Sequence, residues 1–175
     1  MTPASAGAGS RIEAVWAALG EVPDPEVPVI SVVELGIVRG VSLDGDAVVV
    51  TVTPTYSGCP AMREIERDIV SALEERGFDD VTVRTTYTPA WTTDWIGADA
   101  REKLRAYGIA PPGPASLAAL GMTADLVPIR RRRTVPCPYC GSERTTLRSP
   151  FGSTACKAIH FCDACRQPFE EFKAI

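Results

Sequence analysis

Four cysteines in the C-terminal part of the chain have a spacing that can hold a metal ion. They form two C-x-x-C pairs, Cys137 with Cys140 and Cys162 with Cys165, separated by 21 residues. In such a pair, backbone N–H groups point at the sulfur atoms and both thiolates reach one ion, so two pairs provide the four-sulfur tetrahedral shell that zinc prefers. Gly141 suits the tight turn after the second ligand. Iron accepts the same ligands, and the spacing alone leaves zinc, mononuclear iron and an iron–sulfur cluster open.

Cys59 lies far from the other five cysteines, in the segment TPTYSGCPAM at residues 53–62. Pro60 suits the first position of a helix, and the free N–H groups and positive dipole of a helix start favour a thiolate. Gly58 lets the chain turn and leaves the sulfur uncovered. The single histidine of the chain, His160, belongs to the C-terminal segment, which argues against a catalytic Cys–His pair. Metal handling and a structural role as a small buried cap remain open for this thiol.

Cys156 is a further thiol of the C-terminal segment, and His160 stands close to it in the sequence. One interpretation is a small buried thiol and a strand histidine, and the other is an auxiliary thiol beside the metal. Alternation with Ile159 and Phe161 predicts that His160 faces away from these apolar neighbours. Because the four paired cysteines already complete a ligand shell, His160 is not needed as a ligand.

Charge is distributed unevenly over the 175 residues. Residues 1–129 contain 9 Lys and Arg against 18 Asp and Glu, and residues 130–175 contain 9 against 4, so the two parts carry −9 and +5 of the net charge of −4. The acidic total argues against nucleic-acid binding by the whole chain. The run Arg130–Arg133 is either a solvated linker or a docking patch for an acidic partner.

The sequence contains neither an apolar run long enough to span a membrane nor a basic start followed by an apolar stretch. We therefore expect no membrane partner and no export. A cytoplasmic location follows, and in that compartment cysteines serve more often as ligands or reactive thiols than as disulfides.

Hydrophobic periodicity and turn residues predict five elements before residue 90. In order along the chain they are a helix at 10–20 with Ser10 as its N-cap, strands at 37–43 and 47–53, a helix at 61–76 and a strand at 80–87. The turn Asp44-Gly45 joins the first two strands into a hairpin, and the last three elements form a right-handed parallel crossover. The expected fold class is α/β, a small two-layer α-β-β-α-β domain.

Composition divides the chain into four parts. It predicts a disordered tail at residues 1–10 and the α/β domain, with a short last helix, at residues 11–108. It then predicts a Pro- and Ala-rich linker that ends in the arginine run at residues 109–133, and a C-terminal zinc ribbon at residues 134–175. The last part is too short to build a core without a metal or a disulfide. The stretch between its cysteine pairs is expected to supply a β-hairpin.

Three stretches resemble the SufT-like iron–sulfur assembly family: DPEVPVISVVELGIV, TPTYSGCPAM and PAWTTDWIGADAREKLRAYGIAPP. They cover roughly residues 11–112. The ribbon adds CPYCGS, SPFGSTACKA and CRQPFEEFKAI, and with them the whole chain resembles the PaaD (also called PaaJ) family of small subunits associated with the bacterial phenylacetyl-CoA epoxygenase, an oxygenase of phenylacetate degradation.

The resemblance implies that the oxygenase reaction takes place on other proteins of the system and not on this chain. In that system the di-iron centre is on a different subunit, and the reductase carries a flavin and an iron–sulfur cluster. This sequence agrees, because no Glu-x-x-His pair stands on a predicted helix. The signature of the SufT-like family falls on Asp24, Pro25 and Glu26 and on Thr55, Gly58, Cys59 and Pro60. It makes Cys59 the candidate ligand for a transient iron ion or iron–sulfur cluster, with Glu26 as an oxygen ligand and Asp24 and Thr55 in the same site.

We therefore expect a non-catalytic accessory subunit that helps to mature the metal centre of the oxygenase or of its reductase. The expected cofactors are zinc on the four paired cysteines and a transient iron or cluster at Cys59. The expected partners are the other oxygenase subunits or the reductase. The sequence does not decide whether the chain also forms a homodimer. Two alternatives remain: a stably bound component that is structural or gates electron transfer, and a zinc-ribbon regulator that binds nucleic acid through Arg130–Arg133.

Overall fold

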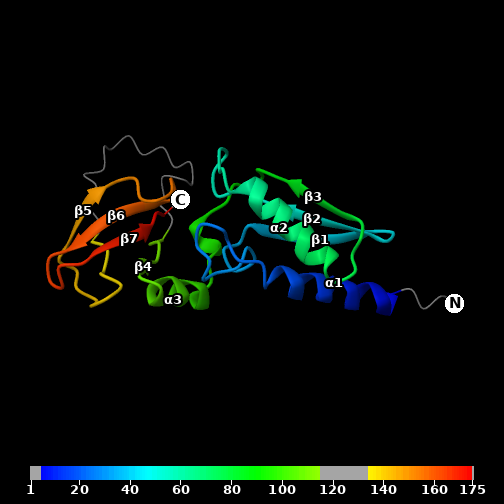
Figure 1. Cartoon of the computed structure of the whole chain (residues 1–175), viewed down its shortest axis with the longest axis horizontal. Coiled ribbons are helices and arrows are strands. Elements are labelled where there is room, and N and C mark those ends of the chain that lie inside the picture. Colours follow the sequence, from blue (N-terminus) through cyan, green and yellow to red (C-terminus); the bar gives the residue numbers. More distant parts are fainter. Residues whose placement is uncertain (1–4, 115–133, 175) are drawn as a thin grey trace, which may run out of the picture. The chain divides into compact units, whose positions relative to one another are not determined.

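The computed structural model describes residues 5–114 and 134–174, which belong to two compact units, Met1–Trp91 and Thr92–Ile175 (Figure 1). The arginine run Arg130–Arg133 and most of the predicted linker lie outside the described residues. Residues 92–108 belong to the unit that carries the four paired cysteines, whereas the sequence predicted a domain boundary after residue 108. The predicted boundaries stay predictions.

The first unit has the predicted order α-β-β-α-β, with α1 at Ser5–Leu19, β1 at Val38–Asp44, β2 at Ala47–Val52, α2 at Met62–Glu74 and β3 at Val81–Thr85. Its sheet has the order β1-β2-β3, with β1 antiparallel and β3 parallel to β2 (Figure 1). The predicted hairpin and parallel crossover, and the α/β fold class, are confirmed. The predicted N-cap at Ser10 is wrong, because α1 begins at Ser5 and Ser10 lies within the helix. The preceding segment SAGAG contains alanine, the strongest helix former, and continues the helix backwards.

The core of this unit lies where α2 meets the sheet and α1. α2 packs against β3 and α1, and α1 also packs against β1. The fully buried side chains at this contact include Ile65, Ile69 and Leu73 of α2 and Val48, Val50 and Val52 of β2. They are the apolar face predicted from the 3.6-residue period and one face of the central strand. This packing fixes the end of β2 relative to the start of α2, and the segment between them carries Cys59.

The second unit contains a 3₁₀ turn η1 at Thr93–Trp95, α3 at Ala98–Ala106 and the strands β4 at Ile109–Ala110, β5 at Thr145–Ser149, β6 at Lys157–Cys162 and β7 at Pro168–Phe172. Its sheet has the order β4-β7-β6-β5, with β4 parallel to β7 and the other neighbours antiparallel (Figure 1). The hairpin expected between the cysteine pairs is β5–β6. The sequence placed the start of the linker at residue 109, and in the structure residues 109–110 form β4, which covers the backbone edge of β7.

α3 is fixed to this second unit by polar and aromatic contacts. The guanidinium of Arg101 donates to the carbonyl oxygens of Ile96 at 2.9 Å, Thr93 at 2.7 Å and Pro112 at 2.6 Å. The ring of Tyr139 lies so close to Gly108 that a Cβ there would come within 2.8 Å of its hydroxyl oxygen. Gly108 also has a φ of 93°, which glycine adopts without strain.

None of the helices in residues 5–114 and 134–174 combines the length and the apolar character of a membrane-spanning helix.

Candidate functional site

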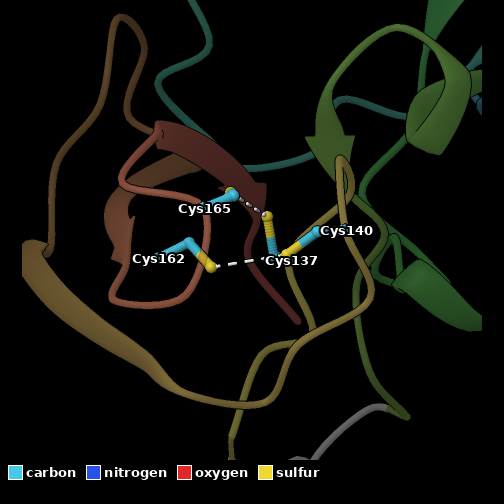
Figure 2. Close-up of side chains that lie close together, drawn as sticks. All are labelled: Cys137, Cys140, Cys162 and Cys165. Carbon is cyan, nitrogen blue, oxygen red and sulfur yellow. Dashed lines mark hydrogen bonds between the residues drawn. The ribbon is translucent and has the colours of Figure 1, made fainter.

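The four paired cysteines converge on one point of the second unit, as Figure 2 shows. Cys137 and Cys140 lie on the first C-x-x-C turn, before β5, and Cys162 and Cys165 lie on the turn that joins β6 to β7. Their Sγ atoms all lie within 4.8 Å of one another. The Sγ atoms of Cys137 and Cys165 are 3.7 Å apart, and those of Cys140 and Cys162 are 3.6 Å apart.

These distances fit a tetrahedral metal site. Four sulfurs around one zinc ion, each about 2.3 Å from it, would lie about 3.8 Å from one another. The two cross-pair distances of 3.7 Å and 3.6 Å agree with that value. Cys137 and Cys162 are buried and belong to the core cluster of the unit together with Ala110, Val135 and Phe169. The metal site therefore occupies the place that a larger apolar core would fill in a longer domain.

The same backbone hydrogen bond closes both C-x-x-C turns. The N–H of Gly141 donates to the carbonyl of Cys137 at 2.9 Å, and the N–H of Arg166 donates to the carbonyl of Cys162 at 2.9 Å. Gly141 and Arg166 each directly follow the second cysteine of a pair, and both have a left-handed backbone, with φ of 72° and 63°. The two turns are thus built alike, although one uses glycine and the other arginine.

Three thiols of this cluster, those of Cys137, Cys162 and Cys165, have perturbed pKa values. The backbone N–H of Cys165 donates to the sulfur of Cys162 and lowers the pKa of that thiol to about 7. Burial raises the pKa of Cys165 to about 12 and also raises the pKa of Cys137. Without a cation, the cluster cannot hold four thiolates side by side and keeps protons. A divalent metal replaces those protons, so metal binding and folding of this unit are coupled.

Neither Cys156 nor His160 belongs to this group. Cys156 is buried, and its Sγ atom lies 3.0 Å from the hydroxyl oxygen of Thr154. His160 is also buried, with its Nε2 atom 2.8 Å from a carboxylate oxygen of Glu171 and its ring stacked on Phe169. The position of His160 agrees with the strand histidine of the sequence interpretation, on the face opposite to Ile159 and Phe161.

Cys59 lies in the first unit, just before α2, where Pro60 and Ala61 form the turn into the helix. The thiol is half-buried, and it is hydrogen-bonded to the backbone N–H of Ala61 and to the side chain of Thr55. The structure therefore brings Thr55 and Cys59 into direct contact, as one candidate site requires.

The electrostatic surroundings of Cys59 do not favour a bare thiolate. Burial raises the pKa of its thiol, and the nearby carboxylates of Glu26 and Asp24 raise it further, which outweighs the bonds from Ala61 and Thr55. The N–H of Ala61 at the helix start lowers the pKa, as the sequence predicted, but the net shift is upward because other effects are larger. Desolvation and two like charges exceed the effect of one helix terminus.

The loop between α1 and β1 holds the two carboxylates near Cys59. Asp24 is buried, and its Oδ1 atom accepts hydrogen bonds from the backbone N–H groups of Glu26 at 2.9 Å and Val27 at 2.8 Å. The backbone N–H of Asp24 in turn donates to the carbonyl of Ile30 at 2.9 Å. Asp24, Glu26, Thr55 and Cys59, which the family resemblance grouped in one candidate site, are thus neighbours. Their role as ligands remains a prediction.

Sequence reasoning missed a second group of side chains on the ribbon, in which Arg148 and Arg166 lie over the ring of Phe161. These residues come from β5, β6 and the turn before β7, so no short motif joins them. One signal was present in the sequence. Arg166 follows its C-x-x-C pair at the position that Gly141 has after the other pair.

Two protein families match the sequence. Residues 12–85 match the iron–sulfur cluster assembly protein family, and residues 124–173 match the PaaD zinc beta ribbon domain. A crystal structure of a domain of unknown function, DUF59, from Bacillus anthracis has the same fold, with a TM-score of 0.52 and 24% identity over 68% of this chain and 99% of that one. Fold and site thus define the class of protein: an α/β domain of the iron–sulfur assembly type followed by a zinc ribbon. The expected structural zinc on the four paired cysteines is confirmed.

A relative covers nearly the whole chain. This relative is an Escherichia coli (strain K12) protein that is named as one of the subunits of a "Putative 1,2-phenylacetyl-CoA epoxidase". It is 48% identical over 165 residues, which are 94% of this chain and 94% of that protein. The chain therefore belongs to the family of this epoxidase component, the PaaD family that the sequence resembles.

Proposed function

We propose that this protein is an accessory subunit of a phenylacetyl-CoA epoxidase and that it carries iron, as an ion or a cluster, to the metal centre of the oxygenase or of its reductase. The role as an epoxidase subunit is supported by the name of the Escherichia coli relative and by the ribbon family. The carrier role is supported by the arrangement of Cys59, Thr55, Asp24 and Glu26 in a domain of the iron–sulfur assembly type. Iron is the cargo of this site, whereas zinc is the resident metal of the ribbon.

The surroundings of Cys59 suit a cation better than a nucleophile. A catalytic thiolate needs a lowered pKa and a base, but the pKa of Cys59 is raised by burial and by two carboxylates. The single histidine of the chain is bonded to Glu171 in the other unit. The same carboxylates that oppose a bare thiolate would stabilise a cation on it, because Glu26 and Asp24 supply negative charge and hard oxygen atoms.

A site with a single cysteine ligand, Cys59, also suits transient binding of iron. Stable iron–sulfur clusters use four protein ligands, and stable zinc sites use a closed shell such as the four cysteines of the ribbon. Cys59 supplies one sulfur, which leaves coordination positions open for ligands of an acceptor protein. Its half-buried position leaves the sulfur accessible for such an exchange.

The carrier role is tested by Cys59→Ala in a strain whose own copy of this subunit is deleted. We expect the variant to fold and keep its zinc, but the epoxidase purified from that strain should contain less iron, and growth on phenylacetate should be slow. The matched control is Cys156→Ala, which removes the other thiol outside the zinc centre and should support normal growth.

Normal growth and a full iron content with Cys59→Ala would refute the carrier role. In that case, co-purification of the unaltered subunit with the epoxidase at a fixed ratio would favour a structural or gating component. Anaerobic loading of the purified protein with ferrous iron and sulfide provides a second readout. An absorbance band that depends on Cys59 and not on Cys156 is the expected result.

A further inference from the structure

Two arginines of the ribbon lie over one aromatic ring. The guanidinium carbons of Arg148 and Arg166 are 5.1 Å and 5.3 Å from the centre of the Phe161 ring, which is within the range of a cation–π contact. Both arginine side chains are exposed. Within residues 5–114 and 134–174, neither guanidinium forms an ion pair with a carboxylate. Their charges are therefore available to a partner.

Arg148 occupies an irregular position of β5. Leu147 pairs with His160 and Ser149 pairs with Ile159, so the register shifts by one residue at Arg148. Such a bulge places an extra residue in one strand, and bulges often redirect a side chain. The irregular register leaves Arg148 without a cross-strand partner residue, with its guanidinium over Phe161.

Arg166 has an unfavourable backbone conformation. Its φ of 63° makes it the one non-glycine residue with a left-handed backbone in the described parts of the chain. The metal-binding turn requires this conformation, but it does not require arginine, because Gly141 fills the equivalent position of the other turn. Glycine would avoid the steric cost that an L-residue has there. The side chain of Arg166 thus stands where the turn alone would favour glycine.

We propose that Arg148, Phe161 and Arg166, here called the arginine–phenylalanine surface, bind an acidic segment of another epoxidase subunit. The inference rests on the proposed function, which makes this chain one subunit among several. Exposed guanidinium groups bind carboxylates through two parallel hydrogen bonds, and arginine with aromatic residues dominates the binding energy of many protein interfaces. The ring of Phe161 holds both cations in place before the partner arrives, which lowers the entropic cost of binding.

An acidic protein segment fits this surface better than nucleic acid. A nucleic-acid interface neutralises many phosphates along a basic stripe. On the ribbon, exposed Glu143 and Asp163 accompany the arginines, and Lys157 is buried in an ion pair with Glu170. The two free guanidinium groups therefore form a small positive patch, which suits a short run of aspartate and glutamate.

The test measures how the full-length, zinc-loaded chain binds purified phenylacetyl-CoA epoxidase that was assembled without this subunit. Charge reversal of both arginines, Arg148→Glu with Arg166→Glu, should weaken binding at least about tenfold near 0.1 M salt, and the loss should shrink as salt screens the charges. The matched control is Arg67→Glu with Arg105→Glu. It makes the same change of charge at two exposed arginines that already have carboxylate partners, and it should bind like the unaltered chain.

Arg166→Gly tests the surface without straining the turn. This variant should keep its zinc and its melting temperature, because glycine suits the left-handed backbone, and it should still bind the epoxidase more weakly. Equal binding of the double charge reversal and the unaltered chain would overturn the inference, and so would an unaltered chain that does not bind the epoxidase at all. A loss of iron transfer in Cys59→Ala is a separate readout, so the carrier role and the docking surface can fail independently.

Two further measurements test whether the arginine–phenylalanine surface binds a different partner. Binding of the unaltered chain to a DNA duplex, lost in the double charge reversal while epoxidase binding persists, would assign the surface to nucleic acid instead. Self-association of the unaltered chain that the double charge reversal abolishes, without any effect on epoxidase binding, would assign it to a second copy. Either result would overturn the proposal.

Discussion

At the scale of single residues, Gly152 shows how closely the ribbon loop is packed. This glycine lies between β5 and β6, and its N–H donates to the carbonyl of Lys157 at 2.8 Å. A Cβ at this position would lie 2.7 Å from a carboxylate oxygen of Glu170 and 3.2 Å from the carbonyl carbon of Lys157. The loop therefore has no room for a side chain at residue 152.

Gly152→Ala should lower the free energy of unfolding of the second unit by about 1–3 kcal/mol, because the added methyl group must displace backbone and an ion pair. Thermal or chemical denaturation of the zinc-loaded protein measures the change. Gly40→Ala is the control, since a Cβ there meets no atom within 4 Å. Equal free energies of unfolding for the two alanine variants would show that the close packing around Gly152 does not contribute to stability.

Residue types and spacing predicted the four zinc ligands, because a C-x-x-C pair brings both sulfurs to one ion by local geometry alone. The neighbourhood of Cys59 with Asp24 and Glu26 came from resemblance, since those residues meet through the packing of a loop against a distant turn. The raised pKa of Cys59 was missed because burial is a property of the folded core and is absent from the local pattern.

At the scale of secondary-structure elements, an ion pair joins β6 to β7. The ammonium of Lys157 lies 3.2 Å from a carboxylate oxygen of Glu170, with side chains that are 5% and 28% exposed. Glu170 also accepts the backbone N–H of Ser153 at 2.7 Å, so one carboxylate links β7 both to β6 and to the loop before it. Burial alone would raise the pKa of Glu170, but Ser153 and Lys157 outweigh it and lower the pKa.

Glu170→Gln should lower the free energy of unfolding by about 1–3 kcal/mol at neutral pH, because it leaves the Lys157 ammonium buried without its charge partner. The pKa of Glu170 is lower in the folded state, so its contribution is fully present above the unfolded value of about 4.5 and is lost as pH falls through the lower folded pKa. Denaturation of both zinc-loaded proteins at neutral pH measures the deficit, and an NMR titration of the Glu170 carboxylate, over the pH range in which the ribbon keeps its zinc, measures its pKa. Glu143→Gln, at an exposed carboxylate, is the control. Equal stability of the Glu170→Gln and Glu143→Gln variants at neutral pH would contradict the argument.

Elements with a strong local signal were predictable, and those created by distant pairing were not. The hairpin around Asp44-Gly45 and the helix α2 follow from turn residues and periodicity. Strand β4 has two residues in a stretch that reads as linker, and it is a strand because β7 offers its open backbone edge. The start of α1 was misplaced because a good N-cap residue can also lie within a longer helix.

At the scale of the whole molecule, the two units differ in how far their folding depends on a metal ion. The second unit depends on zinc, because Cys137 and Cys162 form part of its small core. The first unit has a core of its own, built from α1, α2 and three strands. Loss of zinc should therefore act on one unit and spare the other.

Removal of zinc by a chelator under reducing conditions, or Cys137→Ser, should unfold the second unit and leave the first one intact. The binding free energy of a structural zinc, about 10–16 kcal/mol in small domains, exceeds the stability that a core of this size provides. Amide hydrogen exchange should show faster exchange in β5, β6 and β7 and unchanged protection in β1, β2 and β3. Protection that persists in β6, or that disappears in both units, would show that this division is wrong.

The parallel pairing of β4 with β7 has a consequence for how the ribbon can be transferred between proteins. The compact unit begins at Thr92 and includes α3 and β4. A fragment cut at residue 134 would expose the edge of β7 and remove Tyr139 from its contact with Gly108. We therefore expect a chimaera that receives residues 92–175 to keep a more stable ribbon than one that receives residues 134–175.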